Sequence, residues 1–221
     1  NPATGAPGIY FIDSGQAKPL ATASIEKILR DYPASELATG VLESLRFDAH
    51  ELLIVHLPRH VLVYDSSASQ NGPQWTILKT GMSDAVYRAI DFVYDGNQIT
   101  CGDKTSPMKG VLQFDISSQY GEQQEHLLFT PMFKADNARI FDLELESSTG
   151  VAQYADRLFL SATADGINFG QEQMIEQNAP FVYDKRVILR RAGRVRKNIA
   201  FKIRIVTSSP VTLSGCQVRI E

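Results

Sequence analysis

The sequence predicts a mainly β protein in which propeller-like β-meanders precede a β-sandwich or barrel, with one or two short helices near the N-terminus. Short runs of alternating apolar and polar residues recur along the chain, and a period of two is typical of half-buried strands. Turn-forming residues such as Gly, Pro and Asp separate these runs. With 221 residues, 43% of them hydrophobic, the chain can bury the core of one large β domain or of two smaller ones.

The first forty residues supply a hairpin and the helices. Residues 8–20 run apolar, turn at residues 13–15 and resume, which indicates a β-hairpin. A short amphipathic helix follows, with Ser24 as its N-cap and Pro33 just beyond its end. Residues 35–39 can add one further helical turn. The apolar face of the helix is formed by Ile25, Ile28 and Leu29.

Two antiparallel meanders are expected next. An aromatic residue followed by aspartate occurs at Phe47 and Tyr94, and again at Tyr64 and Phe114, at intervals of about fifty residues. Blades of β-propellers repeat at about this period. We therefore expect residues 1–115 to form a propeller-like region, truncated at its N-terminus because no initiator Met is present. Its strands are expected at residues 41–47, 52–57, 61–64, 75–78, 89–94, 98–101 and 111–114.

A polar segment separates this region from a second group of strands. Residues 116–126 contain no core-forming run, so we expect a linker there. Residues 127–221 have longer strand patterns and are expected to form a β-sandwich-like domain that buries odd-numbered apolar side chains. In residues 139–146 apolar residues alternate with Asp142, Glu144 and Glu146, so one sheet face should be acidic. The other strands are expected at residues 127–133, 157–162, 187–191, 198–206 and 211–220.

Positive charge is concentrated at the C-terminal end. Residues 185–221 hold ten of the 22 Lys and Arg residues and one of the 25 Asp and Glu residues. These basic strands suit the acidic face, either across one sheet or between neighbouring subunits. Alternatively, they contact the phosphates of passing DNA without reading its sequence. The candidate subunit-interface or DNA-facing residues are Arg190, Arg191, Arg194, Arg196 and Lys197.

The sequence offers no catalytic residues, no metal site and no cofactor motif. His50, His56 and His60 lie close together in the sequence, but Pro58 and Arg59 interrupt the segment between His56 and His60, so the two histidines cannot form the i, i+4 ligand pair of a helix. We expect backbone groups to form hydrogen bonds with these histidines. No Gly-x-Ser-x-Gly motif is present, and carboxylate spacing alone cannot define a glycosidase.

Two smaller features have structural interpretations. Cys101 and Cys216 are expected to be free, buried thiols, with a single long-range disulfide as the alternative. Residues 161–169 (SATADGINF) resemble an Asp-box hairpin, in which Asp165 binds amides of its own loop and Phe169 fills the core.

Four long runs resemble the packaged-DNA stabilisation proteins of short-tailed phages, the tail hub or nozzle proteins of Salmonella- and Shigella-type podoviruses. They are residues 43–65 (ESLRFDAHELLIVHLPRHVLVYD), 89–104 (AIDFVYDGNQITCGDK), 113–131 (QFDISSQYGEQQEHLLFTP) and 146–187. The resemblance covers essentially the whole chain. It implies the C-terminal part of a longer hub protein, with a propeller-like fold followed by an added β domain.

The resemblance further implies a structural and non-enzymatic role in the virion tail. Such hubs are made in the host cytoplasm and form a six-fold ring below the portal and its adaptor ring. They close the channel with the tail needle, retain packaged DNA and anchor tailspikes, and no membrane insertion is expected. Two other functions stay open from the residues: a carbohydrate-binding or glycan-processing tail module, and a non-specific DNA-binding module.

Overall fold

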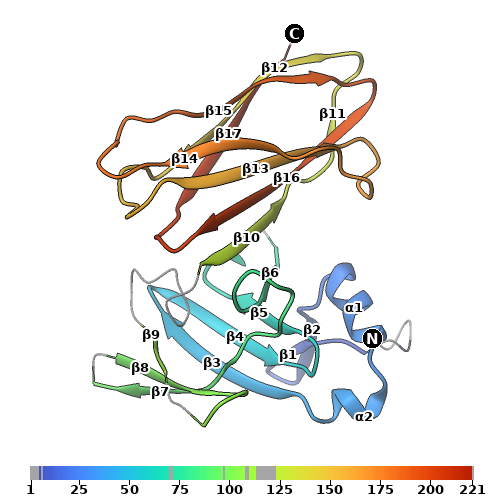
Figure 1. Ribbon diagram of the computed structural model, residues 1–221. Coiled ribbons are helices and arrows are strands. Elements are labelled where there is room, and N and C mark those ends of the chain that lie inside the picture. Colours follow the sequence, from blue (N-terminus) through green and yellow to red (C-terminus); the bar gives the residue numbers. More distant parts are fainter. Residues whose placement is uncertain are drawn as a thin grey trace. The chain divides into compact units, whose positions relative to one another are not determined.

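The computed structural model describes residues 5, 7–69, 72–96, 98–107, 110–112 and 123–220, with backbone alone for residues 110–112, 191 and 192. The chain is mainly β, with two short helices, as the sequence predicts (Figure 1). It divides into two compact units. The first comprises residues 1–80 and 84–114, and the second comprises residues 81–83 and 115–221. Among the described residues, none of the helices has the length and apolar character that crossing a membrane requires.

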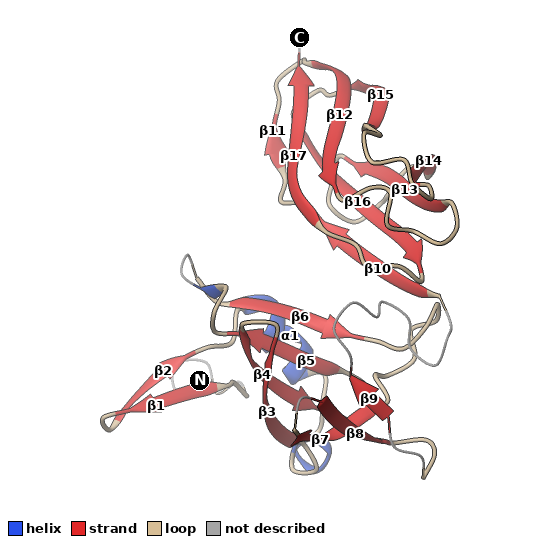
Figure 2. Cartoon of the chain, turned by 90° about the vertical axis from the view of Figure 1, so that its left-hand side faces the viewer, coloured by secondary structure: helices blue, strands red, loops and turns tan. Residues whose placement is uncertain are grey.

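The first unit begins with the predicted hairpin and helices. Strands β1 (Tyr10–Asp13) and β2 (Gln16–Pro19) pair antiparallel and extend away from the rest of the unit (Figure 2). Helices α1 (Ala23–Arg30) and α2 (Ala34–Leu37) follow. The predicted cap is wrong, because Thr22 rather than Ser24 has the extended backbone of an N-cap and its hydroxyl accepts from the Ile25 amide at 3.5 Å.

The two meanders form two separate antiparallel sheets. The first has the order β3-β4-β5-β6, and the second has the order β7-β8-β9. The hairpins turn tightly at Asp48 and Ala49, both with positive φ, and at Gly96 (φ 62°). The predicted turn residue Asn97 and the strand end at residues 113–114 lie outside the described residues. The strands are β3 (Val41–Phe47), β4 (His50–His56), β5 (Val61–Asp65), β6 (Gln74–Leu78), β7 (Ala89–Asp95), β8 (Gln98–Asp103) and β9 (Gly110–Leu112).

The β3–β6 sheet is covered on both faces. Leu62 and Val55 pack with α1 residues Ile25 and Leu29 on one face. On the other face, a second cluster joins this sheet to the β7–β9 sheet, formed by Leu45, Ile54, Val61, Val63, Tyr87, Ala89, Ile99 and Cys101. The alternation of inward and outward side chains along each strand places the two clusters on opposite faces. The sheet therefore sits between the helices and the second sheet.

The second unit is a two-sheet β-sandwich. One sheet has the order β10-β16-β13-β14, with β11 also paired to β16, and the other has the order β15-β12-β17. The strand β14 was not predicted, because its sequence QMIEQN buries the polar residues Gln177 and Asn178. The strands are β10 (Gln124–Phe129), β11 (Phe133–Lys134), β12 (Arg139–Ser147), β13 (Asp156–Thr163), β14 (Gln173–Asn178), β15 (Val187–Arg194), β16 (Asn198–Thr207) and β17 (Leu213–Ile220).

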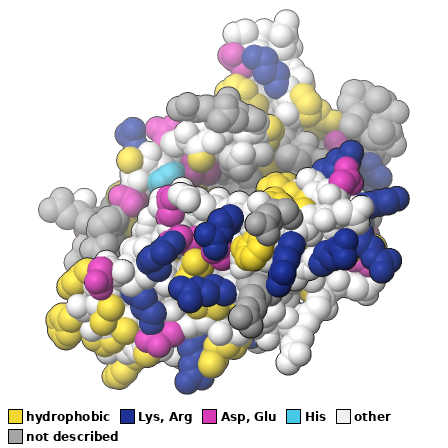
Figure 3. All heavy atoms as spheres, turned by 90° about the horizontal axis from the view of Figure 1, so that it is seen from above, with side chains coloured by type: hydrophobic (Ala, Val, Ile, Leu, Met, Phe, Trp, Pro, Cys, Tyr) yellow, Lys and Arg dark blue, Asp and Glu magenta, His cyan; other side chains and the backbone are white. Residues whose placement is uncertain are grey.

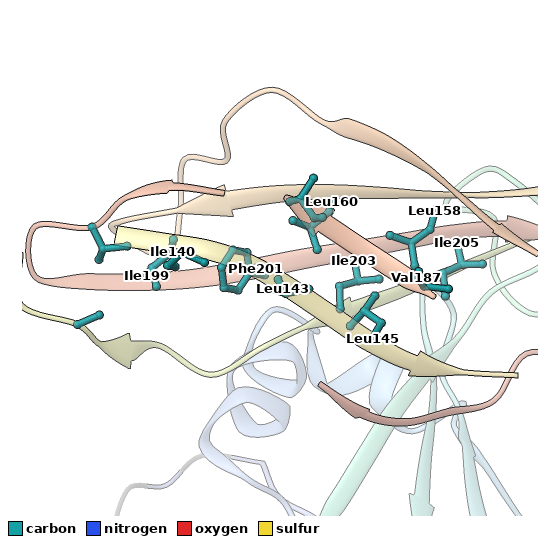
Figure 4. Packing of buried hydrophobic residues seen from close by; sticks show 13 residues of the cluster. Ile140, Leu143, Leu145, Leu158, Leu160, Val187, Ile199, Phe201, Ile203 and Ile205 are labelled. Carbon is teal, nitrogen blue, oxygen red and sulfur yellow. The ribbon is translucent and has the colours of Figure 1, made fainter. Parts of the chain in front are cut away.

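Side chains from both sheets meet in the core of the sandwich (Figure 4). The predicted odd-numbered rule holds for β16, where Phe201, Ile203 and Ile205 are buried, but it fails in β13, where Leu158 and Leu160 point inward. It also fails at the start of β12. A register shift between residues 140 and 142 turns Ile140 inward and leaves Phe141 half-buried.

The predicted linker overlaps a strand. Residues 116–122 lie outside the described residues, whereas residues 124–126 begin β10 and pair with the end of β16. This strand also ends earlier than predicted, at Phe129. The side chain of Gln124 is buried, so a polar residue that the sequence predicted to belong to a linker lies in the sheet.

Candidate functional site

The sheet β15-β12-β17 carries acids on its central strand and basic residues on the strands beside it. The guanidinium of Arg219, on β17, donates to Asp142 at 2.6 Å, and Nε of Arg186, one residue before β15, donates to Glu144 at 2.7 Å. The Arg186 guanidinium lowers the pKa of the Glu144 carboxyl by hydrogen bonding. The sequence left two possibilities for the acidic face, pairing with basic residues within one sheet or with those of a neighbouring subunit. Asp142 and Glu144 pair with basic residues of their own subunit. Figure 3 shows Lys and Arg side chains with Asp and Glu side chains between them.

A second charged group lies on the other sheet of the sandwich. Glu172 accepts from Arg204 Nε at 3.1 Å and from Lys202 Nζ at 2.9 Å, and Arg204 stacks on the Phe159 ring at 4.1 Å. The hydrogen bond from Arg204 is the main reason that the pKa of Glu172 falls to about 2. The sequence alone did not predict that Lys202 and Arg204 have Glu172 as their partner.

This pairing predicts a specific acid response. Because the pKa of Glu172 is depressed in the folded protein, its stabilisation is present above its ordinary pKa of 4.5 and is lost as the pH falls towards about 2. Replacing Glu172 by glutamine should cost about 1 kcal/mol at neutral pH, since the pair is partly exposed, and should flatten this acid response. Urea denaturation at neutral and acid pH measures both effects. Glu176→Gln, which removes an exposed ion pair with Lys185, is the control.

The five candidate basic residues are not gathered on one strand. Arg190 and Arg194 lie exposed on β15, whereas Arg196 and Lys197 lie in the turn before β16. For Arg191 the backbone lies in β15, and its side chain is not among those described. The sequence missed Arg139 of β12, which stands directly opposite Arg194 in the register. A cavity of about 570 Å³ opens beside this pair and is lined by Asn137, Arg139, Gly193 and Arg194.

The three clustered histidines contact side chains, not backbone groups as predicted. His50 Nδ1 lies 2.6 Å from Asp65, and His60 Nδ1 lies 2.6 Å from the Tyr32 hydroxyl. His56 is 4% exposed, and its Nε2 lies 2.6 Å from Glu43. Within the described part of the chain, the structure brings together no group of three or more His, Cys, Asp or Glu side chains that could hold a metal ion.

The Asp-box resemblance is partly right. Asp165 accepts hydrogen bonds from the amides of Ile167 at 2.9 Å and Asn168 at 2.8 Å, which hold its pKa well below the usual range. The expected role of Phe169 is wrong. Its ring is half-buried and packs edge-on against Phe129, with centroids 5.7 Å apart, so it lies outside the core of the sandwich.

The two cysteines are free, as predicted. Cys101 is buried in the core of the first unit. Cys216 is exposed, contrary to the prediction that both thiols are buried, although it stands opposite the buried Leu145 in the register, because β17 is an edge strand of its sheet. Partial burial still raises the pKa of its thiol.

Comparisons with known proteins match the whole chain. A family model described as "Bacteriophage P22 Gp10, beta-propeller" matches residues 1–117, and one described as "Bacteriophage P22 Gp10, beta-sandwich" matches residues 125–221. The chain is 75% identical over 221 residues to the tail hub protein gp10 of Salmonella phage P22, and it spans 47% of the length of that relative. By these matches the chain belongs to the bacteriophage P22 Gp10 family, with both its β-propeller and its β-sandwich parts represented.

Proposed function

We propose that this chain is part of a tail hub, a structural and non-enzymatic component of a phage virion tail. The observation that supports this most strongly is the 75% identity over all 221 residues to a tail hub protein. The ion pairs of Glu144 with Arg186 and of Asp142 with Arg219 also support a structural role, because they stabilise the sheet itself. Particles assembled without the intact protein should lack a functional tail. Complete tails in its absence would contradict the proposal.

The finer assignment is a six-fold ring below the portal and its adaptor ring, which closes the channel, retains packaged DNA and anchors the needle and the tailspikes. The earlier resemblance suggests it. The sequence places the division between the two domains at residues 116–126, and because residues 124–126 belong to β10, we propose that the second domain begins by residue 124. Native mass spectrometry of the intact protein tests the ring, since a hexamer is expected and a stable monomer in the presence of its tail partners would argue against it.

The exposed basic residues of β15 and the following turn are proposed as the contact with a neighbouring subunit. Asp142 and Glu144 are engaged within their own sheet, so an acidic surface elsewhere must supply the partner. Reversing charge with Arg190→Glu and Arg194→Glu should slow ring assembly. Reversal of the paired Arg219 to Glu serves as a comparison, because its main contact lies within the subunit.

The same basic residues favour one second candidate function, contact with DNA phosphates. This predicts that affinity for a random duplex falls steeply with salt, since each phosphate contact releases counterions. Binding that does not change between low and moderate salt would exclude it. Arg196→Gln with Lys197→Gln should reduce the salt dependence if these side chains touch phosphates.

A further inference from the structure

A charge network around the buried His56 joins the two sheets of the first unit. Glu43 lies on β3 and His56 at the end of β4, both on the face that packs against the β7–β9 sheet. Lys104 immediately follows β8. Its ammonium lies 2.9 Å from His56 Nδ1, while His56 Nε2 lies 2.6 Å from Glu43 Oε2. The amide of Phe92 on β7 donates to Glu43 Oε1 at 3.3 Å, so both strands of the β7–β8 hairpin reach the network.

The contacts fix the protonation state of the imidazole. An ammonium is a donor only, so Nδ1 of His56 must accept from Lys104. The ring proton therefore sits on Nε2, where it donates to the Glu43 carboxylate. The His56 ring also lies stacked near Phe92, with centroids 6.4 Å apart. Neutral His56 is thus a bridge between a cation from one sheet and an anion from the other.

We propose that Glu43, His56 and Lys104 form an acid-sensitive latch, which holds the β7–β9 sheet against the β3–β6 sheet while His56 is neutral and releases it when His56 gains a proton. Protonation places a second N–H on the ring, facing the Lys104 ammonium. The acceptor on which Lys104 depends is lost at the same moment. His56 is buried, whereas Lys104 reaches it from an exposed position, so the repulsion between the imidazolium and the ammonium is only partly screened by solvent.

The charges around His56 set the direction of this response. Burial and the Lys104 ammonium lower the pKa of His56, and the Glu43 and Asp91 carboxylates oppose them. Arg88 also lines the cleft of about 360 Å³ beside His56, and its guanidinium is held by Asp103 at 3.1 and 2.5 Å. Burial lowers the pKa of Lys104 as well.

The sign of the pH dependence follows from these shifts. A histidine whose pKa is lowered by folding binds its proton more readily in the unfolded chain. Its contribution to stability is therefore complete above the ordinary value of 6.5 and is lost as the pH falls from there through the folded pKa. Because the network spans two sheets, the loss of stability should appear first as separation of β7 and β8 from the β3–β6 sheet. The strands β4 and β5 should be affected later.

Hydrogen exchange of the full chain, followed from about pH 7.5 to about pH 5 and corrected for intrinsic rates, tests the latch. The amides of β7 and β8 should exchange about tenfold faster once His56 is protonated, while those of β4 and β5 change little. An NMR titration of the His56 ring gives the midpoint against which exchange is compared. Equal acceleration in β4 and β5, or no acceleration across that midpoint, would overturn the proposal.

Three variants sharpen the test. His56→Gln keeps an acceptor for Lys104 and a donor for Glu43 but does not titrate, so its exchange should not respond to acid. Lys104→Met removes the opposing cation, so protonated His56 keeps its contact with Glu43 and the response should vanish. His50→Gln is the matched control on the same strand and should retain the wild-type response. A full acid response in His56→Gln refutes the latch. If that variant does not fold, the wild-type titration alone decides.

Discussion

Replacing Phe201 by alanine should lower the free energy of unfolding of the sandwich unit by about 3–5 kcal/mol. The Phe201 side chain is 1% exposed and is among the largest buried side chains of the chain. It lies on β16, which pairs with both β10 and β13, so the cavity would open in the middle of the five-stranded sheet and against β12. A well-packed core collapses poorly around such a void.

Urea denaturation followed by circular dichroism measures this loss. The chain has one tryptophan, Trp75, which lies on β6 of the other unit and packs on Tyr64 at 5.4 Å. Its fluorescence should report little change, because the cores of the two units share no residue among those described. Phe181→Ala is the matched control, since Phe181 is 84% exposed and should cost under about 0.5 kcal/mol. Equal losses for the two variants would contradict the packing described.

Replacing Thr207 by valine should destabilise the same unit by about 2–3 kcal/mol at neutral pH, although the two side chains have nearly the same shape. The Thr207 hydroxyl donates to Asp156 Oδ2 at 2.8 Å and accepts from the Ser209 amide at 2.8 Å. All three residues are buried. Valine would leave a buried carboxylate without this donor and a buried amide without its acceptor.

The Thr207 variant also has a distinctive pH dependence. Burial raises the pKa of Asp156, and the hydrogen bond from Thr207 partly offsets the rise. Without that donor the folded protein binds a proton on Asp156 more readily, so the cost of the substitution should shrink as the pH falls and Asp156 becomes neutral. Differential scanning calorimetry at neutral and mildly acid pH measures it. Thr212→Val, at an exposed position, should show neither effect, and a cost independent of pH would argue against the role of Asp156.

The local sequence predicted most of the strands, for a simple physical reason. In β3 and β16, side chains alternate between the core and the outer face, and the run of residues shows that period directly. Two short turns, at residues 14–15 and at Gly96, use residues that tolerate positive φ. The strand β14 escaped prediction because its buried residues Gln177 and Asn178 are polar, and they form hydrogen bonds with residues far away in the sequence, Ser147 at the end of β12 and Gly150.

The sequence could not predict which charged residues pair with each other. Arg219 and Asp142 are 77 positions apart, and His56 and Lys104 are 48 positions apart. Any of several basic residues could have paired with Asp142 until the strand order β15-β12-β17 placed β17 beside β12. Likewise, the bulge that turns Ile140 inward arises between paired strands, so no pattern within β12 alone reveals it.

The sequence by itself determined the mainly β class, the two meanders and the family, because alternation and long stretches of similar sequence are properties of the chain that need no tertiary contact. The tertiary structure alone decided which acid meets which base and that His56 bridges two sheets. Those contacts are set by strand order and register, which bring together residues that the chain keeps far apart.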